Sequence, residues 1–381
     1  MNDKKNVPFF DLKKQYQKIQ FEIEKAISNV LSTGEYVLGE TTDRFERSFA
    51  EYCGVKYCIG TNNGTMALVI ALLASGVKAG DKVLVPANSF ISTANAVRII
   101  NAIPVFCDVN KDTWTIDISN IIDAVQKHGS IKAIIPVHLY GIMADMKFII
   151  RWAKENNVIV IEDACQAHGS LYEGEHAGTL GEVGCFSFYP TKNLGAYGEA
   201  GGIVTNNREI YKIALSLRNN GFLSPHGMQK YIHPIFGYNA RISQIQAAIL
   251  SVKLKYLRDW LSSKDDIVKI YKENIFVSVQ HQSSFTENNK IGRHIFTICI
   301  NDRPSLMEYL SNNGIQTAIH YPIPIHKQGC YEEYNTEKIE NVEYLSDHIL
   351  SLPLYPEMKT DEVIYVCQAI NKFYGHNKIN I

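Results

Sequence analysis

The sequence lacks the basic excess that is typical of proteins that bind nucleic acids. Its 381 residues include 38 Lys and Arg against 39 Asp and Glu, a formal net charge of −1, whereas neutralising a phosphate backbone usually takes a surplus of cations. It also lacks a long hydrophobic run. The longest, residues 66–74, is far shorter than the roughly 20 residues of a membrane-spanning helix, and no apolar segment follows the first residues as in a secretory signal. We therefore expect neither nucleic acid nor a membrane as a partner.

The eight cysteines lack the spacing of a metal site. No two are arranged as C-x-x-C, and the closest pair, Cys53 and Cys58, has no second pair nearby to complete a zinc site. Several lie inside apolar runs, as Cys107 and Cys299 do, which is typical of small buried side chains in a reducing compartment. The sequence therefore predicts a cytoplasmic protein without a metal.

Apolar residues are plentiful enough for a sizeable core, because 46% of the chain is hydrophobic and 20% is charged. Between residues 56 and 206, short runs that are apolar at most positions alternate with segments of helix length. Such runs are expected for strands covered on both faces. The expected strands are 57–60, 83–86, 104–109, 132–137, 158–163, 185–189 and 202–205. The expected helices are 66–75, 94–100, 118–127 and 146–156. This alternation predicts an α/β domain with a mostly parallel sheet flanked by helices.

The chain changes character after this domain. Residues 241–260 carry apolar side chains along one face and predict one long helix. After about residue 262, helices mix with short strands. We therefore expect a large domain, 1–261, which includes an N-terminal helical segment, and a smaller α+β domain, 262–381.

Polar residues at the ends of the expected strands mark the candidate site, because ligands of an open parallel sheet bind at the carboxyl ends of its strands. The first such place is 58–68, where a strand leads through a turn containing glycine into an apolar helix. The first N–H groups of that helix, its dipole and the Thr65 hydroxyl form an anion site. An ordinary turn capped by Asn63 or Thr65 explains the same residues. The spacings of G-x-G-x-x-G and of the P-loop are missing.

The second place is 158–169, where an apolar strand ends in Glu162 and Asp163 and is followed by Gln166 and His168. A carboxylate at this edge can pair with a cationic cofactor nitrogen or with a metal. A turn capped by Asp163 is the alternative interpretation.

The third place is 185–196, where Lys192 follows an aromatic strand. Most lysines are solvated surface charges. A lysine held among Phe, Tyr, Pro and Leu is poorly solvated, however, so its pKa should fall, which suits an amine that forms a Schiff base. Taken together, a phosphate cradle, an acid and a lysine at the strand ends of one sheet are the set that pyridoxal 5′-phosphate (PLP) needs.

These three segments resemble a known family. Further motifs of that family follow its order along the chain, at 7–12, 34–39, 136–141, 237–241 and 319–324. The chain is similar over nearly its whole length to the sugar aminotransferases of the DegT/StrS group. These are PLP enzymes of the aspartate-aminotransferase fold, known as fold type I. The resemblance implies that fold, with a large PLP-binding domain and a smaller carboxyl-terminal one.

The resemblance also implies roles for single residues. Lys192 is implied to form the Schiff base with the cofactor and later to shuttle a proton, and Asp163 to keep the pyridine nitrogen protonated. Further cofactor contacts are implied for Phe90 on the ring face, Gln166 at the ring hydroxyl, Gly64, Thr65 and Ser187 at the phosphate, and Asn239 from a neighbouring subunit. Core packing explains Phe90 equally well, as it does Tyr189.

Tyr189, His320 and Tyr321 resemble residues that line a sugar-nucleotide pocket. Because the chain is close to neutral overall, a nucleotide diphosphate needs a local cluster of donors. Arg241 and Lys230 are candidates for that cluster.

The activity that the resemblance implies is transfer of an amino group from an amino acid, glutamate in the first place, to a keto group of a nucleotide-linked sugar. The segment 320–324 together with Gln328 resembles members that aminate the C3 ketone of dTDP-3-keto-6-deoxyhexoses. A UDP-linked 3-keto sugar is the next choice, and a 4-keto sugar is the third.

Other classes of protein fit the sequence less well. A regulatory protein that keeps the fold without turnover has no need of both Lys192 and Asp163. The related PLP-dependent sugar dehydratases carry His in place of the lysine. A metal-dependent hydrolase using His320, His326 and Asp163 lacks any recognisable ligand spacing. The resemblance thus favours an aminotransferase, and the role implied for Asn239 makes it a homodimer with shared active sites.

Overall fold

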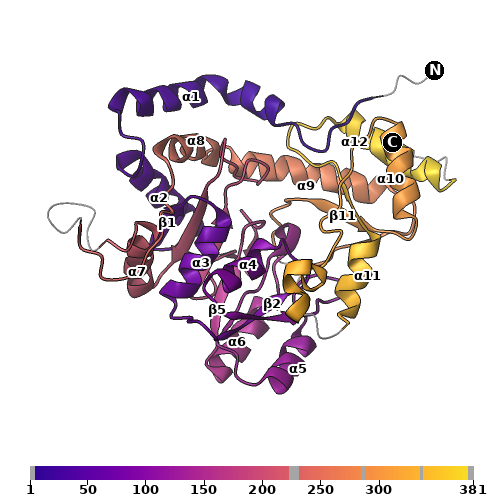
Figure 1. Cartoon of the computed structure of the whole chain (residues 1–381). Helices are drawn as coiled ribbons and strands as arrows, with labels where there is room; N and C mark the ends of the chain where they lie inside the picture. Colours follow the sequence, from indigo (N-terminus) through magenta and orange to yellow (C-terminus); the bar gives the residue numbers. More distant parts are fainter. Residues whose placement is uncertain (1–4, 223–230, 285–288, 335–337, 376–381) are drawn as a thin grey trace.

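The computed structural model describes residues 5–222, 231–284, 289–334 and 338–375 (Figure 1). Its centre is a seven-stranded sheet with the spatial order β1-β9-β8-β5-β4-β2-β3. The strands are β1 (Tyr57–Thr61), β2 (Lys82–Pro86), β3 (Ile103–Cys107), β4 (Ala133–Ile134), β5 (Ile159–Asp163), β8 (Val183–Ser187) and β9 (Gly201–Thr205). β9 pairs antiparallel with β1 and β8, and the other neighbours are parallel. The predicted α/β class with a mostly parallel sheet is confirmed, and each expected run overlaps one of these strands.

Helices cover both faces of this sheet, and alternate strand residues face opposite layers. On one face Ile59, Ile161 and Ile203 pack against α3 (Gly64–Ala74), α4 (Ser92–Ile99) and α7 (Arg208–Arg218). On the other face Val160 and Val204 pack against residues of α2 (Glu40–Cys53), α5 (Ile118–His128), α6 (Met146–Asn156) and α8 (Gln244–Leu254). Figure 1 shows α1 (Leu12–Thr33) lying across α8 on the outside of that layer. The buried strands are apolar at most positions because both of their faces are covered.

The carboxyl-terminal part forms a second core around a three-stranded antiparallel sheet with the order β10-β11-β12. Its strands are β10 (Gln280–His281), β11 (Phe296–Cys299) and β12 (Ile349–Leu352), and its helices are α9 (Leu257–Asn274), α10 (Arg303–Asn312), α11 (Glu340–His348) and α12 (Thr360–Phe373). Val7, from the other end of the chain, also packs in this core. The expected domain boundary at 261/262 stays a prediction. It falls inside α9, whose first turn packs in the large core and whose later turns pack in the small one.

The prediction of one helix over 241–260 is wrong, because the chain turns between α8 and α9. The N–H groups of Lys255 and Tyr256 donate to the carbonyls of Val252 and Lys253, three residues earlier. This tight turn lets α8 pack on α1 and α2 while α9 leads to the smaller sheet. An apolar stripe continues through such a turn, so periodicity alone does not show it.

Shorter elements complete the described structure. They are the hairpin β6 (Leu171–Tyr172) and β7 (Glu175–His176) and the 3-10 helices η1 (Leu139–Gly141), η3 (Ile325–Lys327) and η4 (Gly329–Tyr334). Within the described ranges, no helix combines the length and apolar character needed to cross a membrane. No group of three or more His, Cys, Asp or Glu side chains suited to a metal ion occurs there either. All eight cysteines are free thiols, and Cys330 is exposed.

Candidate active site

Asp163 is the last residue of β5 and is held in place from two sides. Its Oδ2 accepts a hydrogen bond of 2.7 Å from the Thr93 hydroxyl, and its Oδ1 accepts one of 3.2 Å from the backbone N–H of Cys165. The Thr93 hydroxyl lies 2.8 Å from that of Ser89. The carboxylate is 5% exposed, so these contacts replace much of its hydration and fix its direction.

Its neighbour Glu162 points to the opposite face of the sheet and has a structural role. One carboxylate oxygen accepts from the N–H groups of Leu180 and Gly181, and the other accepts from Gly178 N–H and from His138 Nε2. Four donors therefore satisfy this fully buried acid. Of the two carboxylates that end the strand, Asp163 faces the cavity described below.

Lys192 lies in a tight loop after β8, where its backbone N–H donates to the carbonyl of Tyr189 at 2.8 Å. Its Nζ is 3.4 Å from Nε2 of His294. Burial lowers the pKa of the Lys192 ammonium, and the nearby Asp163 carboxylate opposes that shift. The direction is the one expected from the sequence, and it increases the fraction of neutral amine near pH 7.

His294 is a site residue that the sequence did not reveal. Burial, with the nearby Lys192 and Lys264, holds the pKa of His294 well below its ordinary value, so a neutral ring faces Lys192. Its Nδ1 has no hydrogen-bond partner among the described residues. His294 lies two residues before an apolar strand of the smaller sheet and 102 residues after Lys192, so no local pattern marks it.

The amino end of α3 forms the expected cradle. Asn63 is its cap, since its side chain accepts from the N–H of Met66 at 2.8 Å, while the Thr65 hydroxyl donates to Ser92 at 2.9 Å. The backbone is closely approached here: a Cβ on Gly64 would lie 2.8 Å from the Cβ of Ser187, the last residue of β8. The first N–H groups of the helix, with no intrahelical acceptor, remain for an anion.

Aromatic and polar side chains form the rest of the wall. Gln166 accepts from the N–H of Tyr140 at 3.0 Å and donates to the Tyr321 hydroxyl at 3.1 Å. The rings of Phe90 and Tyr321 have centroids 5.7 Å apart. Phe90 is 52% exposed and Tyr189 is 47% exposed, so core packing does not account for either residue.

His320 joins this wall from the carboxyl-terminal part of the chain. Its Nδ1 is 3.0 Å from the Ser351 hydroxyl, and its ring stacks on Phe9. Burial, with Lys192 nearby, lowers the pKa of His320 to about 4. The ring is therefore neutral near pH 7.

One cavity of about 700 Å³ gathers these residues, and of the predicted site residues that the structure describes, all except Asn239 and Arg241 line it. Those two are paired with each other, since the Arg241 guanidinium donates to Oδ1 of Asn239 at 2.7 Å. They lie next to the cradle, because the Asn62 N–H donates to the carbonyl of Ala240 at 3.0 Å. Lys230 lies outside the described residues.

Comparisons with known proteins agree over almost the whole chain. Residues 17–371 match the model of the DegT/DnrJ/EryC1/StrS aminotransferase family. The chain belongs to this family. The dTDP-3-amino-3,6-dideoxy-alpha-D-galactopyranose transaminase of Aneurinibacillus thermoaerophilus is 40% identical over 97% of this chain and 100% of its own. The UDP-N-acetyl-3-dehydro-alpha-D-glucosamine 3-aminotransferase of Acidithiobacillus ferrooxidans is 35% identical over 96% and 97%.

Two solved structures show the same fold. DesV of S. venezuelae superposes with a TM-score of 0.92 at 33% identity, over 98% of this chain and 100% of its own. NtdA of Bacillus subtilis, solved with bound PMP, has a TM-score of 0.87 at 31% identity, over 98% and 87%. Fold type I is thereby confirmed, and this chain is an aminotransferase of the DegT/DnrJ/EryC1/StrS family.

Aminotransferases of this family use PLP, and the cavity suits it. The cradle at Gly64 leaves no room for a Cβ but presents backbone N–H groups, which a phosphate requires. A buried carboxylate and an amine of lowered pKa lie in the same cavity. These are the three kinds of group that PLP needs.

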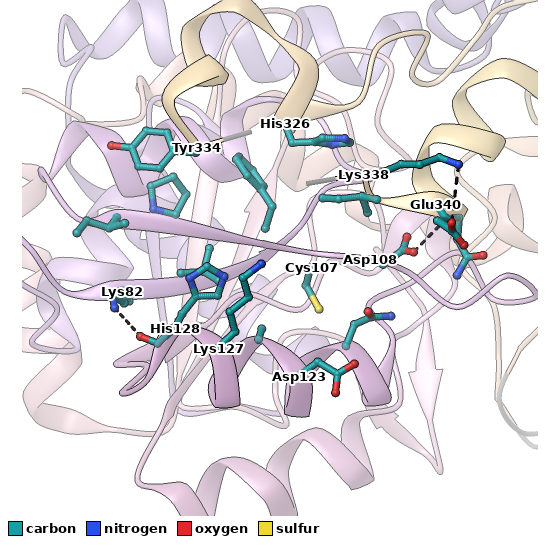
Figure 2. A pocket seen from close by; sticks show the side chains of 18 of the residues that line it. Lys82, Cys107, Asp108, Asp123, Lys127, His128, His326, Tyr334, Lys338 and Glu340 are labelled. Carbon is teal, nitrogen blue, oxygen red and sulfur yellow. Dashed lines mark hydrogen bonds and ion pairs between the residues drawn. The ribbon is translucent and has the colours of Figure 1, made fainter. Parts of the chain in front are cut away.

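A second cavity, of about 580 Å³, is of a different kind (Figure 2). It runs along the outer edge of β3, from Lys82 and His128 at one end to Asp108 and Glu340 at the other. The Lys82 ammonium donates to the His128 carbonyl, and the Asp108 carboxylate accepts from the N–H groups of Asn341 and Val342. These charges hold the walls together, and the cavity does not gather the carboxyl ends of several strands as the first one does.

Proposed function

We propose that this aminotransferase moves an amino group from glutamate to the C3 ketone of a nucleotide-linked sugar, with dTDP-3-keto-6-deoxyhexoses as the preferred class. One observation carries the proposal. Lys192, with its lowered pKa, lines the same cavity as the Asp163 carboxylate and the amino end of α3. An amine, an acid and a phosphate cradle are thus held together by the ends of one sheet.

Bound PLP supplies an aldehyde that takes up an amino group and a ring that accepts electrons. Asp163, fixed by Thr93 and the Cys165 N–H, would hold a proton on the ring nitrogen. Lys192 would bind the aldehyde through Nζ and later, as a free amine, take a proton from the substrate carbon and return it. The backbone of Gly64 and Thr65, with the Ser187 hydroxyl, would bind the phosphate.

The remaining walls would orient the sugar and the ring. Gln166, bonded to Tyr140 N–H and to the Tyr321 hydroxyl, would face the ring hydroxyl, and Phe90 would cover one ring face. Tyr189 and the neutral His320 would contact the sugar. The names of both relatives place the new amino group at C3, which supports C3 before C4.

We further propose a cytoplasmic homodimer with shared active sites. Apolar side chains around Asn239 and Arg241 are unusually exposed, with Phe236 at 83% and Ile232 at 50%. Exposed apolar patches of this kind are typical of protein interfaces. A second copy covering them would bring Asn239 and Arg241 to the phosphate end of the neighbouring cavity. The eight free thiols are in keeping with a reducing compartment.

The test begins with the cofactor. Purified protein incubated with PLP and reduced with borohydride should carry the cofactor on Lys192, as located by peptide mapping. Lys192→Ala should carry none and show no turnover, while Lys154→Ala, which removes an exposed lysine on α6, should behave as the wild type. A protein that takes up no PLP contradicts the proposal.

The substrates are tested next. Glutamate should convert the bound cofactor to its amine form, and a dTDP-3-keto-6-deoxyhexose should then yield an amino sugar detectable by mass spectrometry. Amination of a 4-keto sugar in its place would overturn the C3 assignment. Uptake of PLP without turnover of any keto sugar would favour a regulatory protein.

A further inference from the structure

Lys264 of α9 is a buried lysine that contacts two chain segments next to Lys192. Its side chain is 4% exposed. Its Nζ donates to Oδ1 of Asn193 at 2.8 Å and to the backbone carbonyl of His294 at 3.4 Å. Asn193 is the residue after Lys192, and the ring of His294 lies against the Lys192 amine. The Lys264 ammonium thus connects the two segments that flank the Lys192 amine.

The contacts of Asn193 extend this connection. Its Nδ2 donates to the Gly292 carbonyl at 2.9 Å, so its side chain bridges Lys264 and the segment that leads to His294. Gly292 itself is closely packed, because a Cβ there would lie 2.4 Å from the carbonyl oxygen of His168. The segment therefore has little freedom to shift, and the bridge transmits its position to the Lys192 loop.

A cavity of about 20 Å³ lies behind this bridge and is lined by Lys192, Lys264 and Glu357, among others. Oε1 of Glu357 has no partner among the described residues. The space exceeds the roughly 10–15 Å³ that one water molecule needs. Burial lowers the pKa of Lys264 to about 7, and Glu357 opposes that shift. The Glu357 carboxylate therefore helps to stabilise the charge of the Lys264 ammonium, which the apolar surroundings disfavour.

The chain offers a matched comparison in Lys253 of α8. This lysine is 1% exposed, and burial lowers its pKa to about 7 as well. Its Nζ donates to the carbonyl of Gly195 at 2.5 Å, so it anchors the same loop three residues further on. Among the described contacts, it makes no hydrogen bond to Asn193 or to His294. Lys253 and Lys264 are about equally buried, but they donate hydrogen bonds to different residues.

We propose that Lys264 is a positioning residue for Lys192: by holding the Asn193 side chain and the His294 carbonyl together, it directs the Lys192 amine into the cavity. The proposal rests on the proposed role of Lys192 as the amine that binds PLP. It assigns to Lys264 no contact with substrate or cofactor. Its function is exerted through Asn193 and His294.

The test measures how fast the apoprotein takes up PLP and how Lys192 reacts when no cofactor is present. The second-order rate constant for PLP uptake is followed by absorbance. The pH profile for acetylation of Lys192 is followed by peptide mapping, with the exposed Lys154 as internal reference. Lys264→Met should slow uptake by about tenfold or more and move the acetylation midpoint of Lys192 to higher pH, because a released side chain is better solvated.

Asn193→Ala should have the same effect, and the double variant should be no worse than either single one, because both changes break one connection. Lys253→Met should slow uptake by less than about threefold even if it lowers stability as much. Additive effects in the double variant, or an equal effect of Lys253→Met, would overturn the proposal. So would uptake and an acetylation profile that Lys264→Met leaves unchanged.

If Lys264→Met does not fold, Asn193→Ala decides alone, and unchanged uptake in that variant overturns the proposal. The proposed function fails separately. If borohydride attaches the cofactor of the wild-type protein to another lysine, the role of Lys192 is wrong whatever the Lys264 variants do.

Discussion

The hydroxyl of Thr93 donates a hydrogen bond of 2.7 Å to Oδ2 of Asp163, although the two residues are 70 positions apart in the chain. Thr93 lies in the first turn of α4 and Asp163 ends β5, so the bond joins a helix to the carboxyl edge of the sheet. The acid that we propose as the partner of the cofactor nitrogen therefore depends on a residue outside its own segment.

Replacing Thr93 by Val should weaken the enzyme without unfolding it, because Val has nearly the same shape but lacks the hydroxyl. A hydrogen bond to a charged group contributes about 1.5–3 kcal/mol, which corresponds to a loss of roughly tenfold to a hundredfold in kcat/KM. Ser89→Ala is the control, since Ser89 contacts the Thr93 hydroxyl but not Asp163. Equal losses in both variants would contradict a direct role of the Thr93–Asp163 bond.

Gly201→Ala should impair the phosphate cradle. A Cβ on Gly201 would lie 2.4 Å from the carbonyl carbon and oxygen of Asn63, and Asn63 caps α3. Real Cβ atoms do not come so close to backbone, so the cap and the N–H groups behind it must move. We expect the affinity of the apoprotein for PLP, measured by fluorescence titration, to fall by about tenfold or more. Gly329→Ala, where a Cβ meets nothing within 4 Å, should leave that affinity unchanged.

Glu162→Gln should destabilise the protein rather than alter its chemistry. The carboxylate accepts four hydrogen bonds, and the amide group of Gln would turn a donor toward one pair of these donors. We expect a loss of about 3 kcal/mol in the free energy of unfolding, measured by urea denaturation. Glu175→Gln, at an exposed position in β7, should change it by less than about 0.5 kcal/mol. A Glu162→Gln variant as stable as the wild type would contradict this account.

The sequence predicted the elements and the three strand ends of the site because each depends on local pattern. Apolar runs covered on both faces, a turn containing glycine and a lysine in apolar surroundings are all visible within about ten residues. The supports of the site are not local. Thr93, His294 and Lys264 reach Asp163 or the Lys192 segment across 70 or more positions, and nothing in their own neighbourhoods marks them.

The turn between α8 and α9 and the places of Asn239 and Arg241 show the same limit of local pattern. α8 is buried on several sides and α9 is amphipathic, so apolar side chains continue through the turn and only packing on α1 and around the smaller sheet separates the two helices. Asn239 was predicted from a resemblance that includes a second subunit, and Arg241 from the need for a local cluster of donors to a nucleotide diphosphate. In a single chain they lie beside the cradle without lining the cavity.

Phe236→Lys should therefore dissociate the proposed homodimer. The side chain is 83% exposed in the single chain, and a charge in the centre of an apolar interface is costly because it loses its hydration. We expect a shift from dimer to monomer in sedimentation velocity, together with weaker PLP binding, since Asn239 would no longer reach the neighbouring site. Tyr344→Lys, which changes an aromatic residue that is 50% exposed on α11, is the control. A dimer that persists in Phe236→Lys would place the interface elsewhere.

The buried Lys264 should make the stability of the apoprotein depend on pH in a defined direction. Its pKa is about 7 in the folded chain, against an ordinary value of 10.5. Between these values the folded chain binds fewer protons at this residue than the unfolded chain, so stability rises with pH. This gain in stability is complete above about pH 10.5, and it is lost progressively as the pH falls from there through about 7. The Lys264→Met variant has no titrating group at this position. The other buried groups are common to the variant and the wild-type protein.

The difference between the two proteins therefore isolates Lys264. From pH 6.5 to pH 9 the wild-type protein should gain on the order of 2 kcal/mol in unfolding free energy relative to Lys264→Met, measured by urea denaturation of the apoproteins. Lys154→Met, at an exposed position on α6, should show no such relative change because its lysine is solvated in both states. Parallel pH profiles of the wild type and Lys264→Met would contradict this account, because they mean that the Lys264 ammonium keeps its ordinary pKa in the folded protein. Its contacts would then offset the cost of burial more fully than Glu357 alone explains.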